Sequence, residues 1–107
     1  MKHRIGAGLA VVALAINTLP ALAQEGDTRA GLAVAQDTCA ACHAIRTGQQ
    51  STNANAPPFE KIASVPGMSA IALQASLQTS HRSMPNLILS TRDRRNVAAY
   101  ILSLQPK

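Results

Sequence analysis

Two cysteines and a histidine are the residues of this chain whose types and spacing can do chemistry. Cys39 and Cys42 are separated by two alanines, and His43 follows directly. On a helical turn, side chains three positions apart share one face, so both thiols can bond the two vinyl groups of one porphyrin. The neutral imidazole of His43 would then be an axial ligand of the iron. The Cys-x-x-Cys-His spacing therefore predicts covalent attachment of one c-type haem.

Three other kinds of site use the same residue types. A structural zinc site needs about four protein ligands, whereas this chain has one cysteine pair and its other histidines are His3 and His81. A thioredoxin-like redox pair would lie beside a βαβ pattern, and no strand is predicted near Cys39. A buried structural pair of thiols next to an unrelated histidine stays open on the short motif alone.

A methionine is the expected second ligand of the iron. An iron bound only by His43 would leave a site open for oxygen or peroxide, whereas a thioether closes that site and favours the reduced state. Met84 precedes Pro85 in a loop 41 residues beyond His43, which is enough chain to pass around a porphyrin and return to its opposite face. Met68 is interpreted as a flexible core residue. His81 is the alternative ligand, although we expect a loop-packing role for it.

The first 23 residues have the pattern of a secretory signal. Residues 2–4 are basic, residues 5–16 form an apolar stretch, and residues 21–23 are a small-residue cleavage site. The apolar run has 12 residues, against about 20 for a membrane-spanning helix, so an uncleaved anchor is the weaker interpretation. We expect cleavage after Ala23, a periplasmic location, and no stable membrane insertion of the product.

The remaining residues 24–107 form a single small domain with little conventional core material. Phe59 and Tyr100 are its aromatic residues, the chain has no tryptophan, and both cysteines are assigned to the motif. A domain of this size is close to the lower limit for a self-sufficient core. A buried porphyrin would supply the missing apolar contacts, and this supports the interpretation of the motif.

The charge of the chain is mildly basic. Removal of Lys2 and Arg4 with the signal would lower the net charge from +5 to +3. A cluster of arginines is either a docking surface for an acidic partner or a solvated helix face; its members are Arg82, Arg92, Arg94 and Arg95. Nucleic-acid binding is not supported, because the chain has no recognised motif and no aromatic platform among its basic residues.

The apolar pattern predicts helices throughout the domain. We expect helices over residues 28–42 and 69–77, a short helical turn over 59–63, and a last helix that starts after Ser90 and stops before Pro106. Residues 46–55 are polar and rich in turn-forming types, so they are expected to form an exposed loop. The loop over residues 79–89 contains the candidate ligand Met84.

With the haem motif and the segment 83–87 both in view, the chain resembles the small single-haem class I c-type cytochromes of bacteria. Gly31, eight positions before Cys39, and Tyr100 match the close crossing of the first and last helices in that family. The resemblance implies an all-α, cytochrome c-like fold of three to four helices around one covalently bound haem c. It also implies that a proline carbonyl, here that of Pro57, accepts a hydrogen bond from His43.

The sequence also departs from the family. Ala35 lies four residues before the first cysteine, where the family often has a bulky residue. The Trp or Tyr side chains that hold haem propionates in larger members are missing here, so those contacts are not predicted.

The resemblance implies a non-enzymatic function, which is one-electron transfer between redox proteins by a His/Met-ligated haem. Expected partners are an upstream dehydrogenase or quinol-oxidising complex and a downstream oxidase, with the chain acting as a monomer. One alternative is a dedicated haem subunit of a periplasmic dehydrogenase. The other is a haem sensor or peroxidase whose distal ligand is labile.

Overall fold

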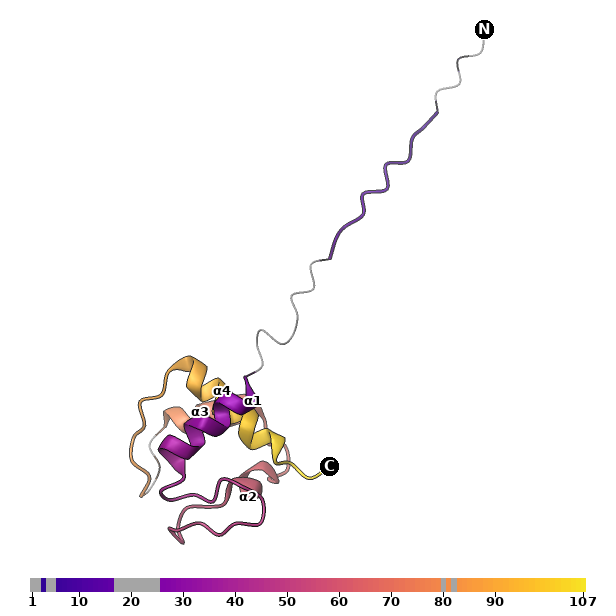
Figure 1. Ribbon diagram of the computed structural model, residues 1–107. Helices are drawn as coiled ribbons and strands as arrows, with labels where there is room; N and C mark the ends of the chain where they lie inside the picture. The colour runs from indigo at the N-terminus through magenta and orange to yellow at the C-terminus, as the bar shows by residue number, and fades with distance from the viewer. Residues whose placement is uncertain (1–2, 4–5, 17–25, 80, 82) are drawn as a thin grey trace.

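The computed structural model describes residues 3, 6–16, 26–79, 81 and 83–107, and it is helical with no strand in those ranges. The elements wrap around a common centre (Figure 1). In chain order they are α1 (Thr28–Val34), the π-helix η2 (Ala35–Cys39), α2 (Phe59–Ala63), α3 (Ala70–Gln78) and α4 (Thr91–Ser103). The all-α, cytochrome c-like fold predicted from the sequence is confirmed.

Side chains of the residues before them cap three of the helices. Asp27 accepts from the backbone N–H of Ala30 at the start of α1. Ser69 caps α3 and Ser90 caps α4 in the same way, through the third residue that follows each. Each cap satisfies one of the backbone N–H groups that a helix start leaves without an intrahelical partner. The boundaries of the last two helices are therefore encoded locally.

The first predicted helix is not one continuous α-helix. Residues 28–42 were expected to be helical throughout, but α1 ends at Val34 and continues as η2. The Ala40 N–H donates to the Ala35 carbonyl at 2.9 Å, five residues back, which is the bond of a π turn. The wider turn changes the direction in which the following residues are presented. Cys39, at the end of η2, remains buried.

Helices α1 and α4 pack at backbone distance, as the resemblance implied. A Cβ atom on Gly31 would overlap the backbone carbonyl of Asn96 and would lie 2.9 Å from the Tyr100 Cβ. The Asn96 side chain is buried and its Oδ1 accepts from the Asp27 N–H at 2.9 Å, so the crossing is also hydrogen-bonded. The absence of a side chain at Gly31 is what allows this approach.

The core is small and lies between α4 and the other elements. Val97, Ala98 and Ile101 of α4 are buried, together with Ala35 and Phe59. On α3 the apolar spacing is only partly used: Leu73 is buried and Leu77 packs against the core, but Ile71 is exposed. Position on the helix therefore decides burial, because Ile71 lies on the solvent side of α3.

The described part of the N-terminal segment, residues 3 and 6–16, has no regular secondary structure. Its large apolar side chains are exposed, for example Leu9 at 91% and Val12 at 77%. Figure 1 shows this stretch running away from the helices. Residues 17–25, which include the predicted cleavage site after Ala23, lie outside the described residues. Within the described ranges, no helix has the length and apolar character needed to span a membrane.

Replacing Gly31 with alanine tests the close crossing of α1 and α4. The added methyl group would meet backbone atoms of Asn96, which cannot rotate away, so the two helices must separate. We expect the free energy of unfolding to fall by at least about 2 kcal/mol in Gly31→Ala, as in other overpacked sites. Denaturant unfolding of the holoprotein measures this. The control is Ala33→Ser, at an exposed position of α1; equal stability of the two variants would contradict the proposed contact.

Candidate haem-binding site

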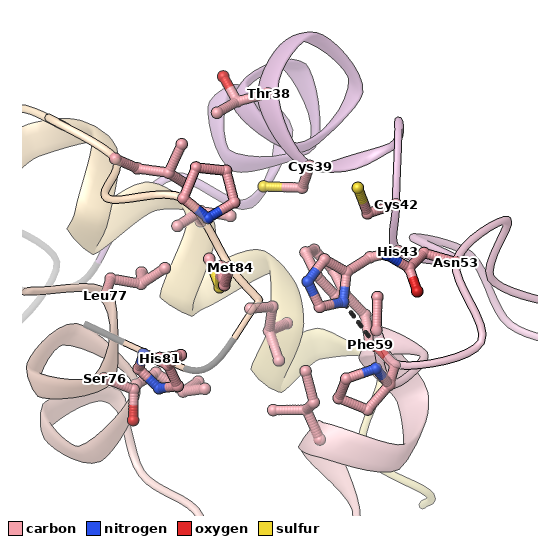
Figure 2. Close-up of a pocket in the computed structure, with 18 of the residues that line it drawn as sticks. Thr38, Cys39, Cys42, His43, Asn53, Phe59, Ser76, Leu77, His81 and Met84 are labelled. Carbon is pink, nitrogen blue, oxygen red and sulfur yellow. Dashed lines mark hydrogen bonds between the residues drawn. The ribbon is translucent and has the colours of Figure 1, made fainter. Parts of the chain in front are cut away.

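The residues that the sequence assigned to haem binding line one cavity of about 370 Å³. Cys39, Cys42, His43, Pro57 and Met84 all contribute to its wall. The cavity lies between the segment that follows η2, the helices α3 and α4, and the loop that follows α3 (Figure 2). Its volume is in the range of sites for small molecules and cofactors. The fold therefore gathers residues that lie up to 45 positions apart in the sequence.

The rest of the wall is mainly apolar. Its apolar side chains come from α2, α3, α4 and the two loops, and include Phe59, Ile62, Leu73, Leu77, Leu87, Val97 and Ile101. Val97 and Ile101 lie four positions apart on α4, so they share one face of that helix. A wall of this composition suits a large apolar ring, because apolar contacts with the wall replace contacts of the ring with water.

The two thiols come from the end of η2 and the turn that follows it. Figure 2 shows the sulfur atoms of Cys39 and Cys42 at the same end of the cavity, above the His43 imidazole. The His43 N–H donates to the Cys39 carbonyl at 2.9 Å, and the Cys42 N–H donates to the same oxygen at 3.2 Å. This tight turn keeps the three functional side chains of the motif on one wall.

The environment of Cys39 does not favour thiolate chemistry. Burial raises the pKa of the Cys39 thiol to about 11, because the charged thiolate would lose its hydration. Redox-active cysteines instead have a lowered pKa. Within the described ranges, no group of three or more His, Cys, Asp or Glu side chains is placed to hold a metal ion. The geometry thus supports neither the zinc nor the thioredoxin interpretation.

His43 is oriented by a backbone carbonyl. Its Nδ1 lies 2.7 Å from the carbonyl oxygen of Pro57. A carbonyl can only accept, so Nδ1 carries the proton and Nε2 keeps the lone pair that a metal ligand needs. This is the hydrogen bond that the family resemblance implied for Pro57. The Phe59 ring packs beside the imidazole, with the two centroids 5.4 Å apart.

The polar loop after the motif is tied back to it. The Asn53 N–H donates to the Cys42 carbonyl at 3.2 Å, and the Thr52 hydroxyl donates to the Ala41 carbonyl at 2.6 Å. The Ala44 N–H donates to the Ser51 hydroxyl at 2.9 Å. These bonds fix the exposed loop, which the sequence predicted over residues 46–55, against the turn that carries the thiols.

Phe59 and the last helix, α4, hold the backbone of residues 44–45, directly after His43. Ala44 accepts from the Phe59 N–H at 2.9 Å, and the Tyr100 hydroxyl donates to the Ile45 carbonyl at 2.5 Å inside the protein. Tyr100 also packs against Phe59, with ring centroids 6.4 Å apart. The tyrosine that the sequence linked to the helix crossing therefore has a second contact, which fixes the backbone two residues after His43.

Met84 reaches the cavity from a tight turn. Its N–H donates to the His81 carbonyl at 3.4 Å, and residues 81 and 84 form an isolated antiparallel bridge. Ser83, inside the turn, has a φ of 63°, in the left-handed region. Pro85 favours extended backbone at Met84, as expected, because its ring disfavours helix at the residue before it. Figure 2 shows Met84 across the cavity from the His43 imidazole.

Met68 and His81 line the same cavity as Met84. Met68 is half-buried and packs against the core, which confirms its interpretation as a core residue. His81 is exposed, and its Nδ1 lies 2.8 Å from the Thr79 carbonyl oxygen. The structure therefore brings both sequence-based alternatives to Met84 into its neighbourhood.

Sequence reasoning missed several polar residues of the wall. They lie around the cavity on four segments, and are Thr38, Asn53, Asn55, Ser76 and Ser83. Asn53 and Asn55 come from the polar loop, which was interpreted only as an exposed connection. Side-chain amides and hydroxyls can donate to carboxylates, so these residues are the available counterparts of the missing Trp and Tyr. Their signal in the sequence was weak, since Asn and Ser are also ordinary turn residues.

The donor set and the wall fit haem c. Two thiols lie at one end of the cavity, an imidazole with a free Nε2 lies on one side, and a thioether comes from the other. Thioether links use both thiols, and the nitrogen and sulfur donors are those of a His/Met-ligated iron. The apolar wall matches the porphyrin ring.

Comparison with known proteins agrees with this geometry. The protein family described as cytochrome c oxidase, cbb3-type, subunit III, matches residues 26–101. Cytochrome c-552 of Bradyrhizobium diazoefficiens is 36% identical over 96 residues, which are 90% of each chain. This chain belongs to the c-type cytochromes. No solved structure matches it.

Membership in the c-type cytochromes assigns this cytochrome a general role in haem-based electron transfer between redox partners. Haem c is the cofactor that the family implies, and Cys39 and Cys42 are the cysteines of the chain. Homologous cytochromes are electron carriers. This agrees with the non-enzymatic function expected from the sequence.

Removing the Tyr100 hydroxyl tests how the last helix supports the site. In Tyr100→Phe the buried Ile45 carbonyl loses its partner, and we expect the free energy of unfolding of the holoprotein to fall by about 1–2 kcal/mol. Thermal unfolding measures the change. Arg92→Gln is the control, because it changes an exposed side chain of the same helix. A Tyr100→Phe protein as stable as the wild type would refute this role.

Proposed function

We propose that this cytochrome is a periplasmic one-electron carrier with one haem c, bound through thioether links to Cys39 and Cys42 and ligated by His43 and Met84. The observation that carries the proposal is the convergence of these four side chains on one apolar cavity. Bound haem would supply an iron that alternates between two oxidation states. The chain supplies the ligands and a mainly apolar wall.

The two axial residues have different supports. The Pro57 carbonyl holds the His43 ring in one tautomer and one orientation, so Nε2 faces the cavity in both oxidation states. Met84 is presented by the turn that starts at His81. With both axial positions occupied by protein ligands, no site is left open on the iron, which suits electron transfer better than substrate binding.

The arginine cluster contributes only in part to a partner surface. Arg94 donates to the Leu89 carbonyl at 2.5 Å and is half-buried, so it stabilises the loop before α4. Arg92 is exposed and Arg95 is half-buried, while Arg82 lies outside the described residues. We infer that Arg92 and Arg95 give the surface beside α4 a positive charge that attracts an acidic redox partner.

The likeness to an oxidase subunit family favours an oxidase as the downstream partner, and it supports a second candidate function. In that function the cytochrome is a dedicated subunit that stays bound to one redox complex. Purification from its natural host at high salt separates the two: a free carrier dissociates, because charge-based encounters are screened by salt, whereas a subunit stays with its complex.

Covalent haem attachment is tested by mass. Produced in a bacterium with haem-attachment machinery, the protein is expected in the periplasmic fraction, coloured, starting at Gln24, and heavier than its polypeptide by one haem. Cys39→Ala/Cys42→Ala removes both thiols and abolishes covalent haem, whereas Ala40→Ser, which leaves both thiols, retains it. A colourless wild-type protein with the mass of the polypeptide alone would refute the proposal.

Methionine ligation is tested by absorption. The oxidised protein is expected to show the weak far-red band of a sulfur-to-iron bond. Met84→Leu, which keeps the side-chain volume, should remove this band, and Met68→Leu should leave it in place. If the band is lost in Met68→Leu alone, the sulfur ligand is Met68 and the assignment to Met84 is wrong. Rapid carbon monoxide binding by the reduced wild type would favour the sensor or peroxidase alternative.

A further inference from the structure

A second imidazole of the cavity has the same local arrangement as the proximal one. The Nδ1 atom of His81 lies 2.8 Å from the Thr79 carbonyl oxygen, and that of His43 lies 2.7 Å from the Pro57 carbonyl oxygen. Each carbonyl accepts the Nδ1 proton, so each ring keeps a lone pair on Nε2. Both histidines line the same cavity. His81 is therefore held in the tautomer that a metal ligand requires.

The turn that presents Met84 also presents His81. Directly opposed residues of an antiparallel pair point their side chains to the same side, with Cβ atoms about 5 Å apart. His81 and Met84 are such a pair, and the Met84 N–H donates to the His81 carbonyl at 3.4 Å. Figure 2 shows both side chains on the wall opposite His43. Exchange of one for the other therefore takes place between two directly opposed residues of one bridge.

The turn is suited to such a rearrangement. His81 and Ser83 are exposed, so no packed core has to open when they move. Ser83 has a positive φ of 63°, a conformation that a serine leaves readily when the turn changes. The proximal side differs, because the backbone around His43 is tied to Pro57, Ser51 and Tyr100 by hydrogen bonds.

We propose that His81 is the alternative axial ligand of this cytochrome and binds the haem iron when the Met84 thioether is lost. This inference rests on the proposed function, because it requires haem in the cavity. In the exchange a coordinate bond from sulfur breaks and one from the Nε2 lone pair forms, with no net transfer of electrons or protons. The product has two imidazole ligands, which lowers the reduction potential relative to His/Met ligation.

Met84→Leu holoprotein tests the inference. We expect its iron to remain low-spin, with no far-red band and with the paramagnetic resonance signature of two imidazole ligands. Met84→Leu/His81→Ala should become high-spin. Carbon monoxide should bind reduced Met84→Leu at least about tenfold more slowly than the double variant, because only the fraction without His81 bound can react.

Other donors of the chain provide the controls. Met84→Leu/Lys61→Ala removes a lysine in addition to Met84. Met84→Leu/Met68→Leu removes the remaining thioether of the cavity. Both double variants should stay low-spin. The inference is overturned if Met84→Leu is itself high-spin, or if one of these two controls, instead of His81→Ala, abolishes the low-spin state. In either case the wild type still has its haem and far-red band, so the proposed function survives. A wild type without haem would refute both.

A second measurement avoids dependence on assembly of the Met84 variants. Limited peroxide converts the Met84 thioether of assembled protein to the sulfoxide: one oxygen atom is transferred to sulfur and the peroxide leaves as water. After this oxidation, Met68→Leu protein is expected to gain the two-imidazole signal, and Met68→Leu/His81→Ala is not. The same signal in both proteins, or in neither, would overturn the assignment of His81.

Discussion

The packing of α1 against α4 at Gly31 is the contact on which the rest of the structure depends. Since no side chain separates Gly31 from Asn96, the first helix lies directly on the last. The same first helix continues into the turn that carries both thiols, and the last helix provides Val97 and Ile101 of the cavity wall. The distance between the attachment motif and the apolar wall is therefore set by a glycine eight residues upstream.

The proximal side of the site is built mostly from backbone carbonyls. The Pro57 carbonyl sets the tautomer of His43, and the Ile45 carbonyl binds the Tyr100 hydroxyl of the last helix. A carbonyl can only accept, so each of these two bonds has one fixed direction, from the side chain to the backbone. The domain is small and has few aromatic residues, so hydrogen bonds give this side of the site rigidity that a larger core would otherwise provide.

The sequence predicted what depends on local chemistry, and was less complete where long-range packing decides. Capping serines, the prolines and the apolar spacing of the last helix gave the helices α2, α3 and α4 close to their observed bounds. The π turn of η2 was not predicted, because the apolar pattern of residues 28–42 does not distinguish an α turn from a π turn. Likewise, Asn53 and Asn55 read as loop residues until the fold turns their loop back onto the motif.

The two walls of the cavity differ in how much of the chain holds them. The His43 wall is fixed by hydrogen bonds from a loop, a short helix and the last helix, whereas one exposed turn presents the methionine. A local change at that turn can alter the distal ligand without breaking the hydrogen bonds that hold the His43 segment, because those bonds come from Pro57, Ser51 and Tyr100. In such an arrangement the His43 side keeps one ligand constant. The Met84 side is where a change of ligand can alter the reduction potential of the haem.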